Sequence, residues 1–98
     1  MVFVQLNKSE IKGKKYTAIF YDENRKKIKT THFGSDMSNY TIHKDNDRKQ
    51  RYLDRHSANE NWDDYMSAGA LSRWILWDKT SVAASYNSYL KKFNLSKY

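Results

Sequence analysis

The sequence predicts an α+β fold, in which an N-terminal three-stranded antiparallel β-meander packs on about three C-terminal α-helices. Residues 2–33 alternate apolar and polar side chains in three short runs separated by turn residues, which is typical of antiparallel strands. Residues 68–81 are the most apolar run of the chain, and residues 81–93 repeat apolar side chains at helical spacing. In a chain of 98 residues we expect a single domain, with the meander in residues 1–35 and a helical part in residues 40–98.

The three strands are predicted at residues 2–8, 15–21 and 26–33. The middle strand, KYTAIFY, has the clearest alternation, and the segment Asp22–Arg25 after it is rich in turn-forming residues. Two sets of side chains alternate along the third strand, so we expect one face of the meander to pack on the helices and the other to be lysine-rich. The two sets are Lys27, Lys29 and Thr31 on one side, and Ile28, Thr30 and His32 on the other.

The first helix is predicted at residues 44–56, after a connector at residues 36–43 and before a polar loop at residues 57–67. It is densely charged, and its apolar and basic residues fall on different faces at helical spacing. Asp47 and Arg51 have the i, i+4 spacing of an ion pair that supports a helix. The side chains that can face the core are Tyr52, Leu53 and His56, and those that share the basic face are Arg48, Arg51 and Arg55.

The most apolar run predicts a short buried helix at residues 67–77, with Ser67 as its N-cap. Leu71, Trp74 and Ile75 recur at i, i+3 and i+4 and form one stripe, which predicts that Trp74 is buried. This helix is too short to span a bilayer.

Thr80 or Ser81 is expected to cap the last helix. Lys91 and Lys92 fall at its C-terminal end, where the helix dipole favours cations. Its apolar face contains Val82, Tyr86, Tyr89, Leu90 and Phe93.

Charge is the strongest global signal, because the chain carries a formal charge of +7 and a pI of about 9.6. A small basic protein favours polyanions such as nucleic acid or an anionic surface, although a basic surface can also serve solubility alone. The absence of cysteine excludes disulfides and thiolate zinc sites, and it fits a reducing compartment. The N-terminal residues lack the apolar core of a secretory signal, so we expect a cytosolic or nuclear protein.

Metal and catalytic chemistry find little support in the sequence. His32, His43 and His56 lack the spacing of a tight metal site, so we predict that no metal or cofactor is required. We expect His43 to bond backbone near the start of the charged helix, and His56 to cap its end. The aspartates alternate with arginines or lie in a loop, unlike the convergent carboxylates of a two-metal nuclease, so we do not expect an enzyme. These aspartates are Asp45, Asp47, Asp54, Asp63 and Asp64.

Three blocks of sequence resemble a known group of proteins. They are YTIHKDNDRKQRYLDRH at residues 40–56, ENW at residues 60–62 and AGALSRWILW at residues 68–77. Together they resemble a family of small uncharacterised proteins of large nucleocytoplasmic DNA viruses, which infect amoebae and algae. The resemblance implies a viral origin, and therefore a place in the virion or in the host cytoplasm or nucleus. It brings no catalytic motif.

Cations interleaved with aromatic rings are the remaining candidate for function. Lysine and arginine bind phosphates with little dependence on base sequence, and no motif of a base-reading domain is present. We therefore expect a small non-enzymatic protein that binds nucleic acid through phosphate contacts, with DNA favoured over RNA. Basic residues also flank Tyr16, at Lys12, Lys14 and Lys15. The predicted nucleic-acid-binding residues are Lys26, Lys27, Lys29, Lys44, Arg48, Arg51 and Arg55.

Two other classes of function stay open. A structural or interaction protein, such as a minor capsid or scaffold component, could use the aromatic helices to grip virion proteins. An enzyme is the third class. The first two differ in whether the cations form one continuous patch, or scatter while an apolar patch stays exposed.

Overall fold

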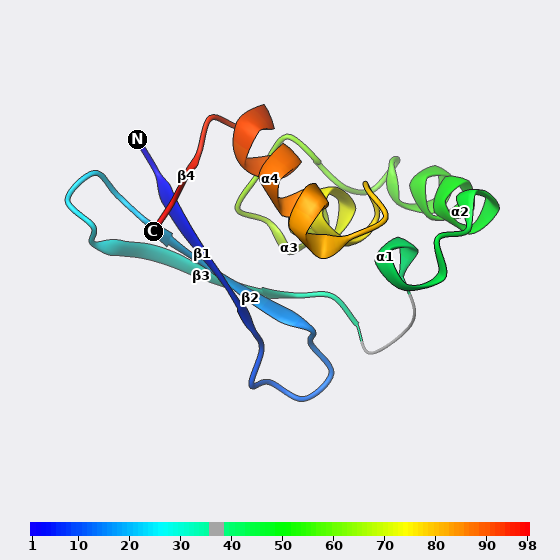
Figure 1. Cartoon of the computed structure of the whole chain (residues 1–98), viewed down its shortest axis with the longest axis horizontal. Coiled ribbons are helices and arrows are strands. Elements are labelled where there is room, and N and C mark those ends of the chain that lie inside the picture. Colours follow the sequence, from blue (N-terminus) through cyan, green and yellow to red (C-terminus); the bar gives the residue numbers. More distant parts are fainter. Residues whose placement is uncertain (36–38) are drawn as a thin grey trace.

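The protein has two layers, a sheet and a set of helices that covers one of its faces (Figure 1). The structure, a computed structural model, describes residues 1–35 and 39–98. Helices α3, η1 and α4 lie against the sheet, whereas α1 and α2 lie beyond the end of β3 (Figure 1). The elements are β1 (Phe3–Lys8), β2 (Tyr16–Tyr21), β3 (Lys27–Phe33), α1 (Tyr40–His43), α2 (Asn46–His56), α3 (Ala68–Leu71), the π-helix η1 (Ser72–Leu76), α4 (Val82–Lys92) and β4 (Ser96–Lys97).

The predicted α+β class and the three antiparallel strands are confirmed, but the sheet has a fourth strand. The strand order is β3-β2-β1-β4, and β4 pairs parallel with β1, so the sheet is mixed rather than a pure antiparallel meander. Asn94, in the left-handed conformation at φ 55°, ends α4, and the Leu95 N–H donates to the Leu90 carbonyl at 2.8 Å. This Schellman turn redirects the chain into β4.

The predicted hairpin turn is also confirmed. Asp22 Oδ1 accepts hydrogen bonds from the backbone N–H groups of Asn24 and Lys26, each at 2.9 Å. Arg25 adopts φ 63°, which lets the chain reverse between β2 and β3.

The prediction of a lysine-rich face opposite the core is wrong. A register shift at Phe20 and Tyr21 pairs Lys29 with the buried Phe20 and Lys27 with Tyr21, so the two lysines start on different faces of the sheet. Thr31, which the simple alternation puts beside the lysines, is buried and donates to the Met66 carbonyl at 2.8 Å. The bulge explains only the position of Lys27, because Thr31 and Lys29 pair with Ala18 and Phe20 in regular register and so share the helix-covered face.

The core lies between the helix-covered face of the sheet and the pair η1 and α4. The N-caps Ser67 and Ser81 are as predicted, and each side chain accepts a hydrogen bond from a backbone N–H three residues later, at 3.1 Å. Within the described residues, no helix is long and apolar enough to cross a membrane. The buried side chains of the core are Val4, Ala18, Phe20, Phe33, Leu71, Ile75, Leu76, Tyr89 and Leu90.

The helix predicted at residues 67–77 is not a continuous α-helix. It begins as α3 and widens into η1, where the Trp77 N–H donates to the Ser72 carbonyl at 3.2 Å in the i to i+5 pattern of a π-helix. The wider turn buries Leu76 beside Ile75 and leaves Trp74 only partly buried at the edge of the core. The prediction that Trp74 is buried is therefore wrong, because it assumed one α-helical period throughout.

The connector predicted at residues 36–43 contains a helix of its own. Its residues 36–38 lie outside the described part, and Asn39 then caps α1 by accepting from the Thr41 N–H at 3.0 Å. Lys44 ends α1 at φ 56°, and Asp45 caps α2, so the charged helix starts at Asn46 rather than Lys44. Within the described residues Asp47 and Arg51 form no ion pair, so that predicted support for α2 is absent.

Candidate anion-binding cleft

A cleft of about 500 Å³ lies where α2 meets the start of α3, the end of η1 and the end of β3. Cations gather at its rim, while glycine, alanine and serine form much of its wall. The side chains and backbone that line it belong to Lys14, Phe33, Gly34, Ser35, Asn39, Arg48, Arg51, Tyr52, Arg55, His56, Glu60, Ala68, Gly69, Ser72, Leu76 and Trp77.

The predicted basic face of α2 opens onto this cleft. Arg48, Arg51 and Arg55 are spaced at i, i+3 and i+7 along α2, are exposed and all line the cleft. We call these three residues the arginine row. Across the described part of the chain, none of the three side chains makes an ion pair or a hydrogen bond. Their guanidinium donors therefore remain available to an anion.

Lys14 brings a fourth cation to the cleft from the loop between β1 and β2. The loop is fastened to β3, because the Lys15 N–H donates to the Phe33 carbonyl at 3.2 Å and to the Gly34 carbonyl at 3.3 Å. Gly34 has φ +81°, and a Cβ there would lie 2.8 Å from Leu76 Cδ1 and 3.1 Å from Lys15 Cβ. Only glycine lets the backbone pass this closely, so Gly34 positions the loop that carries Lys14.

One ring column anchors α2 to the rest of the protein. Tyr52 is buried on the inner face of α2, and its ring stacks on Trp77 with centroids 4.2 Å apart and planes 2° apart. The His56 ring lies 4.3 Å from Tyr52 at 31°. On the same side of α2, Lys49 Nζ donates to the Asp78 carbonyl at 2.7 Å, and burial lowers the pKa of Lys49. With Tyr52 and Lys49 turned inward, the arginine row faces outward.

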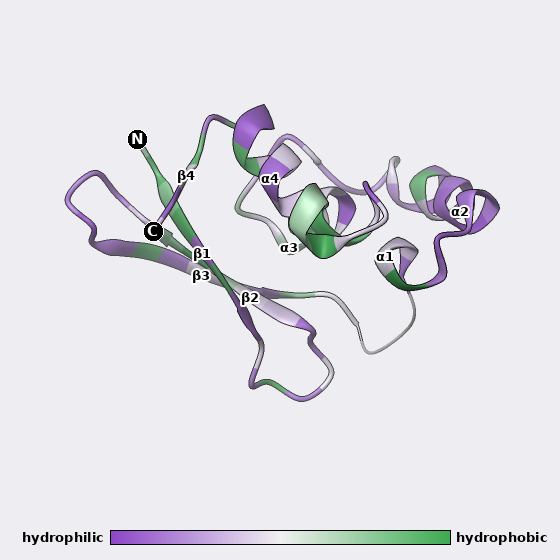
Figure 2. Ribbon diagram, in the orientation of Figure 1, coloured by the Kyte–Doolittle hydropathy of each residue, from purple (hydrophilic) through white to green (hydrophobic). Residues whose placement is uncertain are grey.

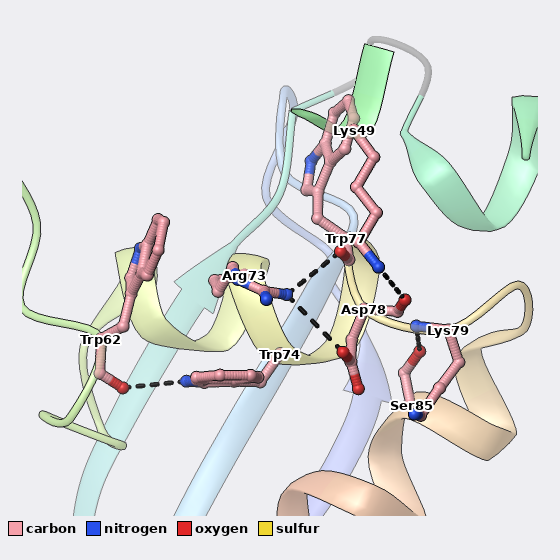
Figure 3. A network of polar contacts seen from close by, with 8 residues as sticks. All are labelled: Lys49, Trp62, Arg73, Trp74, Trp77, Asp78, Lys79 and Ser85. Carbon is pink, nitrogen blue, oxygen red and sulfur yellow. Dashed lines mark hydrogen bonds and ion pairs between the residues drawn. The ribbon is translucent and has the colours of Figure 1, made fainter. Parts of the chain in front are cut away.

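A half-buried polar network holds the end of η1, and with it Trp77, in place (Figure 3). Arg73 Nη1 donates to the Trp77 carbonyl at 3.2 Å and lies 3.7 Å from Asp78 Oδ1. The Arg73 guanidinium also lies 4.3 Å from the Trp74 ring centroid and 5.3 Å from that of Trp62. Burial lowers the pKa of Arg73. This cation is used structurally and does not line the cleft.

Glu60 is the acidic residue in the cleft, and both of its oxygens are engaged. Oε2 accepts from His56 Nδ1 at 3.2 Å, and Oε1 accepts from Trp62 Nε1 at 3.0 Å. A Cβ at Gly69 would lie 3.0 Å from Glu60 Cδ, so glycine lets the carboxylate lie against the start of α3. The expectation that His56 caps the end of α2 is wrong, because Glu60 takes its ring nitrogen instead.

His43 meets the expectation of a backbone hydrogen bond near the start of α2. Its Nδ1 accepts from the Asp45 N–H at 2.9 Å. His32 lies on the sheet, where its Nδ1 is 2.7 Å from Thr17 Oγ1. In residues 1–35 and 39–98, no group of three or more histidines and acidic residues is placed to hold a metal ion.

The seven predicted nucleic-acid-binding residues do not form one patch. Lys26, Lys27 and Lys29 lie on the β2–β3 hairpin and β3, at the opposite end of the long axis from α2 (Figure 1). That axis measures 42 Å. Both regions are strongly hydrophilic (Figure 2). Lys44 is exposed between α1 and α2 but does not line the cleft, so only the arginine row does.

Sequence reasoning did not assign three residues that shape the cleft. Lys14 was part of a recognised basic run, but only the tertiary fold brings it opposite α2. In the sequence, Gly34 indicates the end of a strand and Gly69 indicates close packing, but nothing local relates either glycine to a site.

The fold and the cleft define a small basic α+β protein with four cations around one cleft and other cations elsewhere. The chain belongs to a family of unknown function, DUF5754, whose family model matches residues 4–56. The match spans β1 to α2, and so includes the arginine row, Lys14 and Gly34. No curated protein and no solved structure matches the chain.

Proposed function

We propose that this protein binds nucleic acid through phosphate contacts at the cleft, without catalysing a reaction. The observation that carries the proposal is the arginine row, three unpaired guanidinium groups on one exposed helical face, with Lys14 across the cleft. Guanidinium donors match phosphate oxygens in pairs, and clustered cations raise the local concentration of a polyanion.

The expected binding depends little on base sequence. No base-reading motif occurs in the chain, and phosphate contacts carry no sequence information by themselves. The net charge of +7 adds a general attraction to DNA or RNA. Lys26, Lys27 and Lys29 lie at the opposite end of the long axis from α2 (Figure 1), so we do not expect them to share the phosphates bound at the cleft.

A viral origin, with a place in the virion or in the host cytoplasm or nucleus, remains part of the proposal. Its support is the resemblance of residues 40–56, 60–62 and 68–77 to small proteins of large DNA viruses. That origin also favours DNA over RNA as the partner.

The alternative of a capsid or scaffold component has less support. It requires aromatic side chains that are free to grip a partner, whereas the rings of the helices are largely used internally. Trp77 stacks on Tyr52. The ring centroids of Trp74 and Tyr89 lie 6.4 and 5.4 Å from that of Phe93.

The test is a binding titration with duplex DNA over a range of salt. Each neutralised phosphate contributes a slope of about −0.9 in log affinity against log salt, so the four cleft cations predict about −3.6. Replacing Arg48, Arg51 and Arg55 together by glutamine should flatten the salt dependence, so that the slope changes from about −3.6 to about −0.9 in a protein that stays folded.

The matched control changes Lys26, Lys27 and Lys29 to glutamine, which removes the same amount of charge. This variant should keep a slope near −3.6. A folded arginine variant with the wild-type slope would refute the proposal, as would absence of binding at low salt.

A further inference from the structure

The ring column at the cleft ends in His56, a partly exposed side chain that lines the cleft. Tyr52 has Trp77 and His56 within 4.2 and 4.3 Å. Two rings cannot occupy the same side of Tyr52 at these distances, so Trp77 and His56 lie on its opposite faces. His56 is therefore the outer end of a three-ring column that starts at the core, and its side chain keeps 37% of its exposure.

The orientation of His56 is fixed by Glu60. His56 Nδ1 donates to Glu60 Oε2 at 3.2 Å, a bond made at the edge of the ring and not on its face. The second oxygen of Glu60 is held by Trp62 Nε1 at 3.0 Å. The ring at the end of the column is thus held by hydrogen bonds before any ligand arrives, which reduces the entropy lost on binding.

The cations of the cleft stand beside this ring. Arg55 precedes His56 in the chain, and Arg51 and Arg48 continue the row along α2. The cleft of about 500 Å³ is in the range of small-molecule sites and exceeds what a lone phosphate group needs. Its wall of Ala68, Gly69 and Ser72 adds little side-chain bulk.

We infer that the cleft accepts an unpaired nucleotide of single-stranded nucleic acid, with the base stacked on His56 and the flanking phosphates on the arginine row. The inference rests on the proposed function and adds a strand preference to it. In a duplex the bases are stacked on one another and cannot reach a ring, whereas in a single strand each base offers a face for stacking. The protein should therefore bind single strands more tightly than duplexes with the same number of phosphates.

The experiment compares two oligonucleotides of equal length, one with all its bases and one abasic at every position. Both carry the same phosphates, so phosphate contacts alone predict equal affinity. Stacking of one base predicts a preference of about 5-fold to 150-fold for the intact strand. DNA and RNA versions of the intact strand distinguish the two sources of the same chemistry, and either preference is compatible with the inference.

Three variants locate the effect. His56→Ala should abolish the preference for the intact strand, so that the variant binds the two strands with equal affinity. His56→Phe, which keeps a ring, should retain the preference. Glu60→Gln should raise the affinity for the abasic strand, because it removes a negative charge from the cleft.

The outcomes separate the two proposals. Equal affinity of wild-type protein for the intact and abasic strands would overturn the inference and leave phosphate binding standing. Failure to bind either strand at low salt would overturn both. If His56→Ala does not fold, the comparison of the two strands with wild-type protein and with His56→Phe still decides the question.

Discussion

The sheet core and helix α2 both use aromatic rings, but they use them differently. In the core, Phe20 and Phe33 are fully buried among other apolar side chains, and Tyr89 is buried with its hydroxyl donating to the Tyr65 carbonyl at 2.7 Å. In α2, Tyr52 is the one buried side chain, and it reaches the rest of the protein through Trp77. The core therefore contributes most of the stability. Helix α2 exposes basic side chains and packs on the rest of the protein through a small contact area.

This difference explains how a row of unpaired cations is tolerated. Like charges on one helical face repel one another, and α2 lacks the predicted Asp47–Arg51 pair that would offset this. The N-cap Asp45 and the inward Lys49 stabilise α2 instead, through hydrogen bonds at 2.9 and 2.7 Å. Stability and binding are thus placed on different faces of the same helix.

The largest expected effects on the free energy of unfolding come from removing a buried ring in the core or the buried ring of α2. Phe20→Ala removes a fully buried ring and should lower the free energy of unfolding by about 3–5 kcal/mol. Tyr52→Ala removes the buried ring that packs α2 on Trp77 and should cost about 2–3 kcal/mol. Tyr52→Phe keeps the stack and should cost less than about 1 kcal/mol. Urea melts measure the free energy of unfolding of all three variants. A larger loss of this free energy for Tyr52→Ala than for Phe20→Ala would contradict the view that the core, and not α2, carries most of the stability.

A smaller effect is expected for Trp74, at the edge of the core. Its ring is partly exposed, its Nε1 donates to the Trp62 carbonyl at 2.9 Å, and Lys92 Nζ lies 4.4 Å from its centroid. Trp74→Ala should lower the free energy of unfolding by about 1–2 kcal/mol, below the 3–5 kcal/mol of a fully buried tryptophan. A loss in the upper range would show that Trp74 is a core residue after all.

The smallest effect concerns pH and the joint between α1 and α2. Burial, then the charge of Arg48, lower the pKa of His43 from 6.5, and Asp45 opposes them. The unfolded chain therefore binds this proton more readily, and the stabilising contribution is complete above about pH 6.5 and is lost as pH falls through the folded pKa. Protonation of Nδ1 also removes the acceptor for the Asp45 N–H.

The measurement is the free energy of unfolding at about pH 7.5 and about pH 5, in wild type and in His43→Gln. Wild type should lose more stability on acidification than the variant. Equal losses would assign the pH dependence to other groups. The window stays above the range in which Asp45 titrates, since backbone hydrogen bonds lower the pKa of that carboxyl from 3.8.

Local patterns were enough to predict most elements, and tertiary detail accounts for the errors. The strands, the hairpin turn and the caps Ser67 and Ser81 follow from alternation and side-chain chemistry, which act within a few residues. The two-residue strand β4 has no periodicity to detect, and it forms because the Ser96 and Tyr98 N–H groups find the Val2 and Val4 carbonyls. The π-turn of η1 likewise depends on how the chain packs, not on spacing.

The sequence predicted the arginine row of the candidate site but not the residues on the other side of the cleft. Helical spacing alone groups Arg48, Arg51 and Arg55, because residues three and four apart share a face. Nothing local places Lys14 opposite them, or separates the hairpin lysines from α2 by the length of the molecule. Net charge predicts a polyanionic partner, which stays a prediction, but the fold was needed to show which cations line the cleft.

Mapping the bound surface by NMR tests the central claim most directly. Backbone amide shifts of the isotope-labelled protein are followed while a single-stranded oligonucleotide is added at low salt. The account predicts that the largest changes occur at Lys14, at Gly34, along α2 and at residues 68–72, with little change in the β2–β3 hairpin. Changes confined to the hairpin at residues 22–29, with α2 unaffected, would contradict it.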